Sequence, residues 1–79
     1  MERTELEKSV IGLVAVAYGQ DETSLSVSTS FKTDLKGASV QMVGLVAEIE
    51  NELDVMIPLQ IASACDTIGD LCDKIEEEM

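Results

Sequence analysis

The sequence contains no histidine and no tryptophan, and its only aromatic residues are Tyr18 and Phe31. Without histidine, the chain lacks the commonest general base of enzymes and the commonest metal ligand. With only two aromatic rings, a surface on which nucleic-acid bases stack is not expected. These absences favour a non-catalytic protein that does not bind nucleic acid.

Cysteine is also scarce, since Cys65 and Cys72 are the only two. Two cysteines do not make a disulfide framework, and two thiols without histidine cannot complete a tetrahedral zinc site within one chain. No carboxylate spacing forms a defined cage for a cation, so we expect no metal site. We interpret both cysteines as small core residues, and free thiols are typical of a reducing compartment, here the cytoplasm.

Basic residues number only 5 against 16 acidic ones, which gives a net charge of −11. The imbalance lies mainly in the second half: residues 1–39 hold 6 acids and 4 bases (−2), and residues 40–79 hold 10 acids and 1 base (−9). Such a charge repels nucleic acid and anionic membranes alike. Basic surfaces of partner proteins are therefore the expected binding partners.

Long apolar runs are absent, because no segment approaches the roughly 18 residues that a membrane-spanning helix needs. Residues 10–17 are apolar and end in Ala-Val-Ala, which resembles a signal-peptidase site. The segment before them should be positive, but three glutamates there outweigh Arg3 and Lys8. We therefore expect neither a cleaved signal nor membrane insertion.

The chain has 79 residues, which predicts one domain over residues 1–79 with a small core. Apolar residues from Leu6 to Tyr18 recur at spacings of three and four and predict a helix over residues 4–18. Thr4 and Glu7 have the spacing of a capping box at its start, and Gly19 is placed to end it. Residues 19–38 are rich in Ser, Thr, Asp and Gly and predict a long loop. We expect its isolated apolar side chains to pin it to the core: Leu25, Val27, Phe31 and Leu35.

Residues 40–53 predict a second helix, although residues 48–55 also alternate acidic and other residues as a strand would. Good helix formers favour the helix, and the residues before Pro58 leave it. Residues 59–64 fit about one helical turn, and Thr67 with Asp70 predicts the capped start of a last helix that reaches Met79. The predicted fold is all-α: a monomeric, small antiparallel helical bundle of three main helices plus one short helix, with a long first loop.

Ser39 stands directly after the long loop, at the start of the second helix. One interpretation is a helix N-cap, which is a common role of serine at such a junction. With no histidine in the chain, Ser39 has no obvious base that would make it a nucleophile in its own reaction. The other interpretation is an exposed hydroxyl that a modifying enzyme uses as its substrate.

Two segments carry a resemblance to a known family. Residues 31–45 read FKTDLKGASVQMVGL, and residues 49–58 read IENELDVMIP. Both resemble the signature of acyl carrier proteins, and the resemblance extends over the whole chain in length, helix layout and acidity. The sequence departs from that signature next to the serine. Ala38 replaces the usual Asp, Val40 replaces the usual Leu, and Gln41 and Gly44 stand where acids are common.

The resemblance implies that Ser39 is esterified by 4′-phosphopantetheine, which a phosphopantetheinyl transferase donates from coenzyme A with magnesium. It also implies a carrier of thioester-bound acyl groups for fatty acid, polyketide or related lipid biosynthesis, whose partners are acyl synthases and acyltransferases with basic patches. The implied partner-binding residues are Asp34, Val40, Met42, Val43, Glu48, Glu50 and Glu52. The implied lining of an acyl pocket is Leu45, Val46, Ile61, Ala62 and Ile68.

Two other functions stay open at this point. A carrier of aminoacyl or peptidyl groups would have the same attachment motif. An unmodified acidic helical module that docks on a basic partner would use the same charge without any arm on Ser39. Because Ala38 removes the acid next to the serine, modification by a generic transferase is expected to be weaker than in a family member with that acid.

Overall fold

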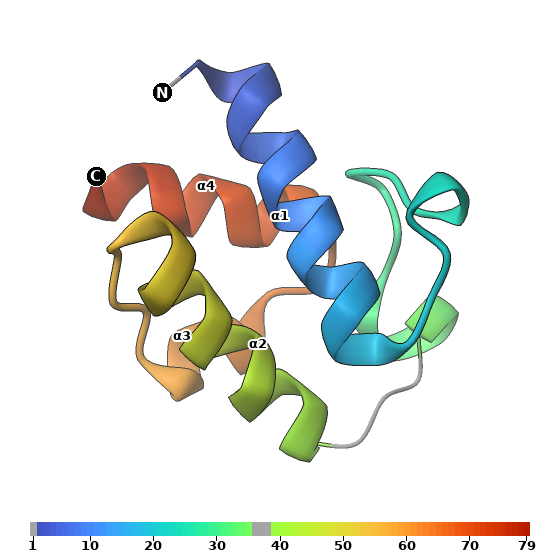
Figure 1. The fold of residues 1–79 in the computed structure, drawn as a ribbon. Coiled ribbons are helices and arrows are strands. Elements are labelled where there is room, and N and C mark those ends of the chain that lie inside the picture. Colours follow the sequence, from blue (N-terminus) through green and yellow to red (C-terminus); the bar gives the residue numbers. More distant parts are fainter. Residues whose placement is uncertain (1, 36–38) are drawn as a thin grey trace.

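The computed structural model describes residues 2–35 and 39–79, with Ser39 described by its backbone. The elements in chain order are α1 (Arg3–Tyr18), a 3-10 turn η1 (Glu22–Ser24), a π-helical turn η2 (Phe31–Leu35), α2 (Ser39–Leu53), α3 (Leu59–Ala64) and α4 (Ile68–Glu78). Figure 1 shows α1 and α2 running in opposite directions, while α4 crosses α1. The predicted all-α fold, with three main helices and one short helix, is confirmed.

The start of α1 differs from the prediction. The helix begins at Arg3 after an extended Glu2, and no side chain caps it, so the expected capping box of Thr4 and Glu7 is wrong. Glu7 instead accepts a hydrogen bond of 2.8 Å from Arg3 Nε. Thr4 lies inside the first turn and cannot adopt the extended backbone that an N-cap requires.

The ends of α1 and α2 both use left-handed backbone. Gly19 has φ 63° and ψ 36°, and the Gln20 N–H donates to the Ala15 carbonyl at 2.9 Å, which satisfies one free carbonyl of α1. Asp54 has φ 56° and donates its N–H to Glu50 at 3.0 Å. Because residues up to Leu53 are helical, the strand interpretation of residues 48–55 is wrong.

The core is built from the apolar stripes of α1, α2 and α4, closed by single residues from the connections. Aliphatic side chains dominate it, and the two rings of Tyr18 and Phe31 pack 5.8 Å apart between centroids. The ten largest fully buried side chains are Leu6, Leu45, Ile49, Ile57, Ile68, Leu71, Ile75, Val10, Val14 and Cys72.

The long connection between α1 and α2 is fixed to the start of α4. Ser30 pairs with Thr67 in an isolated antiparallel bridge, and Ser30 Oγ donates to Asp66 Oδ1 at 2.9 Å. Three backbone hydrogen bonds accompany the bridge: Phe31 N–H to Asp66 O at 2.8 Å, Ile68 N–H to Thr29 O at 3.0 Å, and Gly69 N–H to Val27 O at 2.8 Å.

The four side chains predicted to pin this connection do not all do so. Phe31 is buried, and Leu25 and Leu35 are half-buried against the core. Val27 is exposed, so the prediction is wrong for its side chain, and Val27 holds the connection through its carbonyl instead.

Arg3 joins the first turn of α1 to α4. Its guanidinium lies 2.8 Å from Glu7, 2.8 Å from Asp73 and 3.4 Å from Glu76. The hydrogen bonds that the Arg3 guanidinium donates to Glu7 and Asp73 raise its pKa above its ordinary value. Because the group is one-third exposed, salt screens these pairs.

Within the described residues, no helix has both the length and the apolar character that crossing a membrane would require.

The contact between Gly69 and Val27 leaves little room for a side chain at Gly69. A Cβ at Gly69 would lie 3.0 Å from the Val27 carbonyl oxygen, which accepts the Gly69 N–H. We therefore expect Gly69→Ala to lower the free energy of unfolding by about 1 kcal/mol, measured by urea denaturation.

Gly44→Ala is the matched control for that substitution. Gly44 lies inside α2 with no atom within 4 Å of an added Cβ, so alanine there should raise the free energy of unfolding by up to about 1 kcal/mol. Equal stabilisation by both substitutions would contradict the described contact between the connection and α4.

Candidate functional site

Ser39 is the first residue of α2, so the attachment residue predicted from the sequence lies at a helix N-terminus. With the helix starting at Ser39, the N-cap position falls on Ala38, which lies outside the described residues. The last described residue before Ser39 is Leu35, four positions earlier, at the end of η2.

The N-terminus of α2 suits a phosphodiester. The first backbone N–H groups of a helix have no partner within the helix, and the helix dipole places positive potential there. No acidic side chain lies in the first turn of α2. The first acidic residue of α2 is Glu48, nine residues after Ser39, which corresponds to about 13 Å of helix rise. A phosphate ester on Ser39 would therefore meet attraction from the helix and little repulsion from α2.

Asp34 is the nearest acid on the N-terminal side of Ser39. It lies exposed in η2, and its Oδ2 accepts a hydrogen bond of 2.8 Å from the Ser30 backbone N–H. This hydrogen bond joins Asp34 to Ser30, the residue that pairs with Thr67. Asp34 therefore stabilises the turn η2 and is also exposed on the surface.

The expected partner-binding residues of α2 separate into three groups. Val40 and Val43 are exposed, at 71% and 49%. Met42 is 6% exposed and belongs to the core, so its side chain does not lie on the binding surface that the sequence suggested. It faces inward because it shares the stripe of Leu45 and Ile49. The acids come later: Glu50 and Glu52 are exposed, and Glu48 is half-buried.

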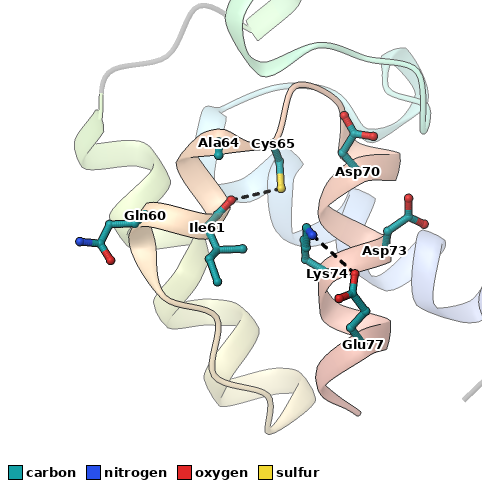
Figure 2. A pocket seen from close by; sticks show the side chains of 8 residues that line it. All are labelled: Gln60, Ile61, Ala64, Cys65, Asp70, Asp73, Lys74 and Glu77. Atoms are coloured by element: carbon teal, nitrogen blue, oxygen red, sulfur yellow. Dashed lines mark hydrogen bonds and ion pairs between the residues drawn. The ribbon is translucent and has the colours of Figure 1, made fainter.

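The expected acyl-pocket residues are brought together with one exception. Leu45, Ala62 and Ile68 are fully buried in the same core cluster, and Val46 packs against it. Ile61 is 42% exposed and faces away from that cluster. Figure 2 shows its side chain in the space between α3 and α4.

Both cysteines are buried and free of disulfide. Burial raises the pKa of the Cys72 thiol to about 11 and also raises that of Cys65. Cys65 Sγ donates to the Ile61 carbonyl at 3.4 Å. The predicted core role of both residues is confirmed. In the described part of the chain, no group of three or more His, Cys, Asp or Glu side chains is placed to hold a metal ion.

Sequence reasoning missed Met56 and Leu59 as surface features. They are large apolar residues with exposures of 68% and 43%, at the entry to α3. A signal was present, because residues 55–65 contain no charged residue in a chain with 21 of them.

Comparison with known proteins agrees with this geometry. Residues 8–75 match the family described as "Phosphopantetheine attachment site". The chain belongs to this family. It is 33% identical over 76 residues to an acyl carrier protein of Porphyromonas gingivalis, covering 96% of this chain and 97% of that protein. It is 29% identical over 77 residues to an acyl carrier protein of Rubrobacter xylanophilus, covering 98% of this chain and 95% of that protein.

The chain is therefore a carrier protein of the acyl carrier type, and its cofactor is 4′-phosphopantetheine. The resemblance identified from residues 31–45 and 49–58 is confirmed at the level of the family.

The raised pKa values of the carrier's thiols predict slow reaction with a thiol reagent. Because the thiolate is the reactive form, burial should make both cysteines react slowly with Ellman's reagent at pH 8. In guanidinium the same sample should release about two equivalents of thionitrobenzoate per chain, at a rate at least tenfold higher than in the folded state. Reaction of Cys72 in the folded apo chain at the unfolded rate would contradict its burial. Cys65 should react before Cys72, because it lines an open groove between α3 and α4.

Proposed function

We propose that this carrier holds acyl intermediates as thioesters on a 4′-phosphopantetheine arm attached to Ser39. We further propose that it acts in fatty acid, polyketide or related lipid biosynthesis, in the cytoplasm and without catalytic activity of its own. The observation that carries the proposal is the position of Ser39 as the first residue of α2, inside the segment that matches the attachment-site family.

The attachment is a phosphoryl transfer. Ser39 Oγ forms a bond to the pantetheine-bearing phosphorus of coenzyme A, the bond from that phosphorus to 3′,5′-ADP breaks, and the hydroxyl proton passes to a base. Because the chain has no histidine, we assign that base and the magnesium to the transferase. The positive end of α2 would favour the phosphodiester that remains on Ser39.

Once attached, the arm supplies a terminal thiol that carries the acyl group as a thioester. Ser39 anchors the arm at the end of a helix, and Val40 and Val43 provide exposed apolar surface beside it. Glu50 and Glu52 supply negative charge farther along α2 for basic patches on acyl synthases and acyltransferases. Asp34 and Glu48 complete the proposed acidic part of this surface.

The small aliphatic core is the proposed binding site for an apolar acyl chain. Leu45, Ala62 and Ile68 lie in one cluster with Val46 at its edge. We propose that an acyl chain enters by separating these side chains, because aliphatic residues without large rings repack at modest cost. Ile61 faces the outer groove and is left out of this proposed lining.

Intact-mass analysis tests the attachment. The purified apo chain is incubated with coenzyme A, magnesium and a broad-specificity phosphopantetheinyl transferase. We expect one phosphopantetheine adduct on the wild-type chain and none on Ser39→Ala. Ala38→Asp should be modified several-fold faster, because an acid beside the serine adds attraction for the basic transferase and its magnesium.

Two results would favour other functions. If no adduct forms on the wild type while a P. gingivalis acyl carrier protein is modified in the same tube, and Ala38→Asp does not restore modification, the unmodified interaction module is favoured. If the holo chain is loaded by an aminoacyl-activating enzyme and not by an acyltransferase, the cargo is aminoacyl or peptidyl.

A further inference from the structure

A polar pocket lies on the connection between α1 and α2. Its lining comes from Gln20, from five residues between Ser24 and Thr29, and from Asp34 and Leu35. Apart from Asp34, none of these residues has a role in the proposed function. The pocket has a volume of about 380 Å³, which is within the range of small-molecule sites. Its size and its polar lining suit part of a ligand that has polar groups.

Hydroxyl side chains dominate the wall of this pocket. Seven of the eleven residues 23–33 are Ser or Thr, and only one of the others is charged. Ser26 Oγ and Ser28 Oγ lie 2.9 Å apart and share one hydrogen bond, so one of these two hydroxyls keeps its proton for another acceptor. Ser24 Oγ donates to the Asp21 carbonyl at 2.7 Å and keeps its lone pairs as acceptors. The wall can therefore both donate and accept hydrogen bonds.

Gln20 and Asp34 add an amide and a carboxylate to this lining. The Gln20 side chain is exposed just beyond the end of α1, where its amide offers both a donor and an acceptor. Asp34 Oδ2 accepts from the Ser30 backbone N–H, so Oδ1 is a second acceptor. Leu25 and Leu35 are half-buried against the core and supply the apolar part of the lining.

The pantetheine part of the arm has the matching chemistry. It carries two amides and one hydroxyl, which donate and accept hydrogen bonds, and a pair of methyl groups near its phosphate-bearing end. The amides match Gln20 and the serine hydroxyls, and the methyl groups match the two leucines. An acyl chain has no polar groups of this kind. The polar pocket and the aliphatic core therefore suit different parts of the same loaded arm.

The pocket is within reach of the attachment residue. Leu35 and Ser39 are four positions apart, so their Cα atoms lie at most about 14 Å from each other. The arm is a chain of roughly 14 covalent bonds, which spans about 18 Å when it is extended. An arm anchored on Ser39 can therefore place its amides at the pocket. Tethering raises their local concentration there to the millimolar range, which is enough to fill a weak site.

Two molecules carry pantetheine to this protein, namely the attached arm and free coenzyme A. The nucleotide end of coenzyme A brings additional phosphates, which the net charge of −11 repels. The attached arm has one phosphate, and that phosphate is at the positive end of α2. Charge therefore favours the attached arm as the occupant of the pocket.

We propose that the pocket lined by Gln20, Ser26 and Ser28 is a resting site for the pantetheine part of the arm. We call it the loop pocket. The inference rests on the proposed attachment of the arm to Ser39, and it adds where the arm lies between encounters with enzymes. An arm in the loop pocket exchanges hydrogen bonds with the carrier, so a partner enzyme must release it before the thiol can enter an active site.

Nuclear magnetic resonance of the carrier with its arm attached tests the proposal, with carbon-13 in the methyl groups of the arm. We expect nuclear Overhauser effects between these methyl groups and those of Leu25. We also expect the amide resonances of Ser26 and Ser28 to differ from those of the apo chain. Residues near Ser39 shift on attachment in any case, so the decisive residues are 20–28, at least eleven positions before it.

Two substitutions remove groups that face the ligand. Gln20→Met removes the side-chain amide at similar length, and Ser28→Ala removes one hydroxyl. Each should lower the Overhauser intensity at Leu25 about threefold, as the loss of one hydrogen bond does. Gln60→Met and Ser63→Ala are the matched controls, because both residues are exposed on α3, and they should leave the intensity unchanged. The apo spectrum of each variant checks that the connection keeps its conformation.

Free pantetheine added to the Ser39→Ala chain tests the loop pocket without attachment. We expect the resonances of residues 20–28 to shift with a dissociation constant in the millimolar range. Coenzyme A should bind more weakly because of its additional charge. Tighter binding by coenzyme A than by pantetheine would overturn the proposal and assign the pocket to the free molecule.

Two further results would overturn the proposal. One is a carrier whose mass shows the arm, but whose arm methyl groups give no Overhauser effect to Leu25 and leave residues 20–28 unchanged. The other is contact of the arm with Ile61 instead of Leu25, which would place it in the groove between α3 and α4. Absence of an adduct on wild-type Ser39 is a failure of the proposed function. In that case the titration with free pantetheine decides, and unshifted residues 20–28 would exclude the loop pocket.

Discussion

Residues 27–31 are held against residues 66–69 by three backbone hydrogen bonds and by the contact of Ser30 with Asp66, and this attachment fixes the long connection after α1 to the start of α4. Each of the three long helices is specified locally by its apolar stripe, but the connection between α1 and α2 has few apolar side chains of its own. Fixing it to the start of α4 offsets the conformational entropy of a long loop. Ser39, the first residue of α2, follows this connection in the sequence.

Much of the fold could be predicted from the sequence because helical signals are local. The spacing of apolar residues located α1, α2 and α4, and Gly19 and the Thr67–Asp70 capping box marked boundaries that the structure confirms. The attachment of the connection could not be predicted, because it uses backbone groups of Val27 and Thr29 that any residue would supply. The Thr4 capping box failed because α1 begins one residue earlier, at Arg3, whose side chain pairs with Asp73 and Glu76 of α4.

The candidate site was predictable only in part. Ser39 followed from a motif, and its place at the start of α2 agrees with that prediction. Met42, expected on the partner-binding surface, is buried, and Ile61, expected in the acyl pocket, is exposed. In α3, six residues are too few for a periodic stripe to show which side meets the core, so tertiary packing decides. The absence of charge in residues 55–65 was the available sign of an apolar surface.

The central claim is that Ser39 carries the arm. It is tested most directly on the chain co-produced with a phosphopantetheinyl transferase and then digested with trypsin, which releases residues 37–74 as one peptide. Tandem mass spectrometry of this peptide distinguishes Ser39 from Ser63, the other serine it contains. The account predicts that phosphopantetheine is ejected from fragments that contain Ser39 and from none that contain Ser63 alone. Phosphopantetheine on Ser63, or unmodified Ser39 in every molecule, would contradict it.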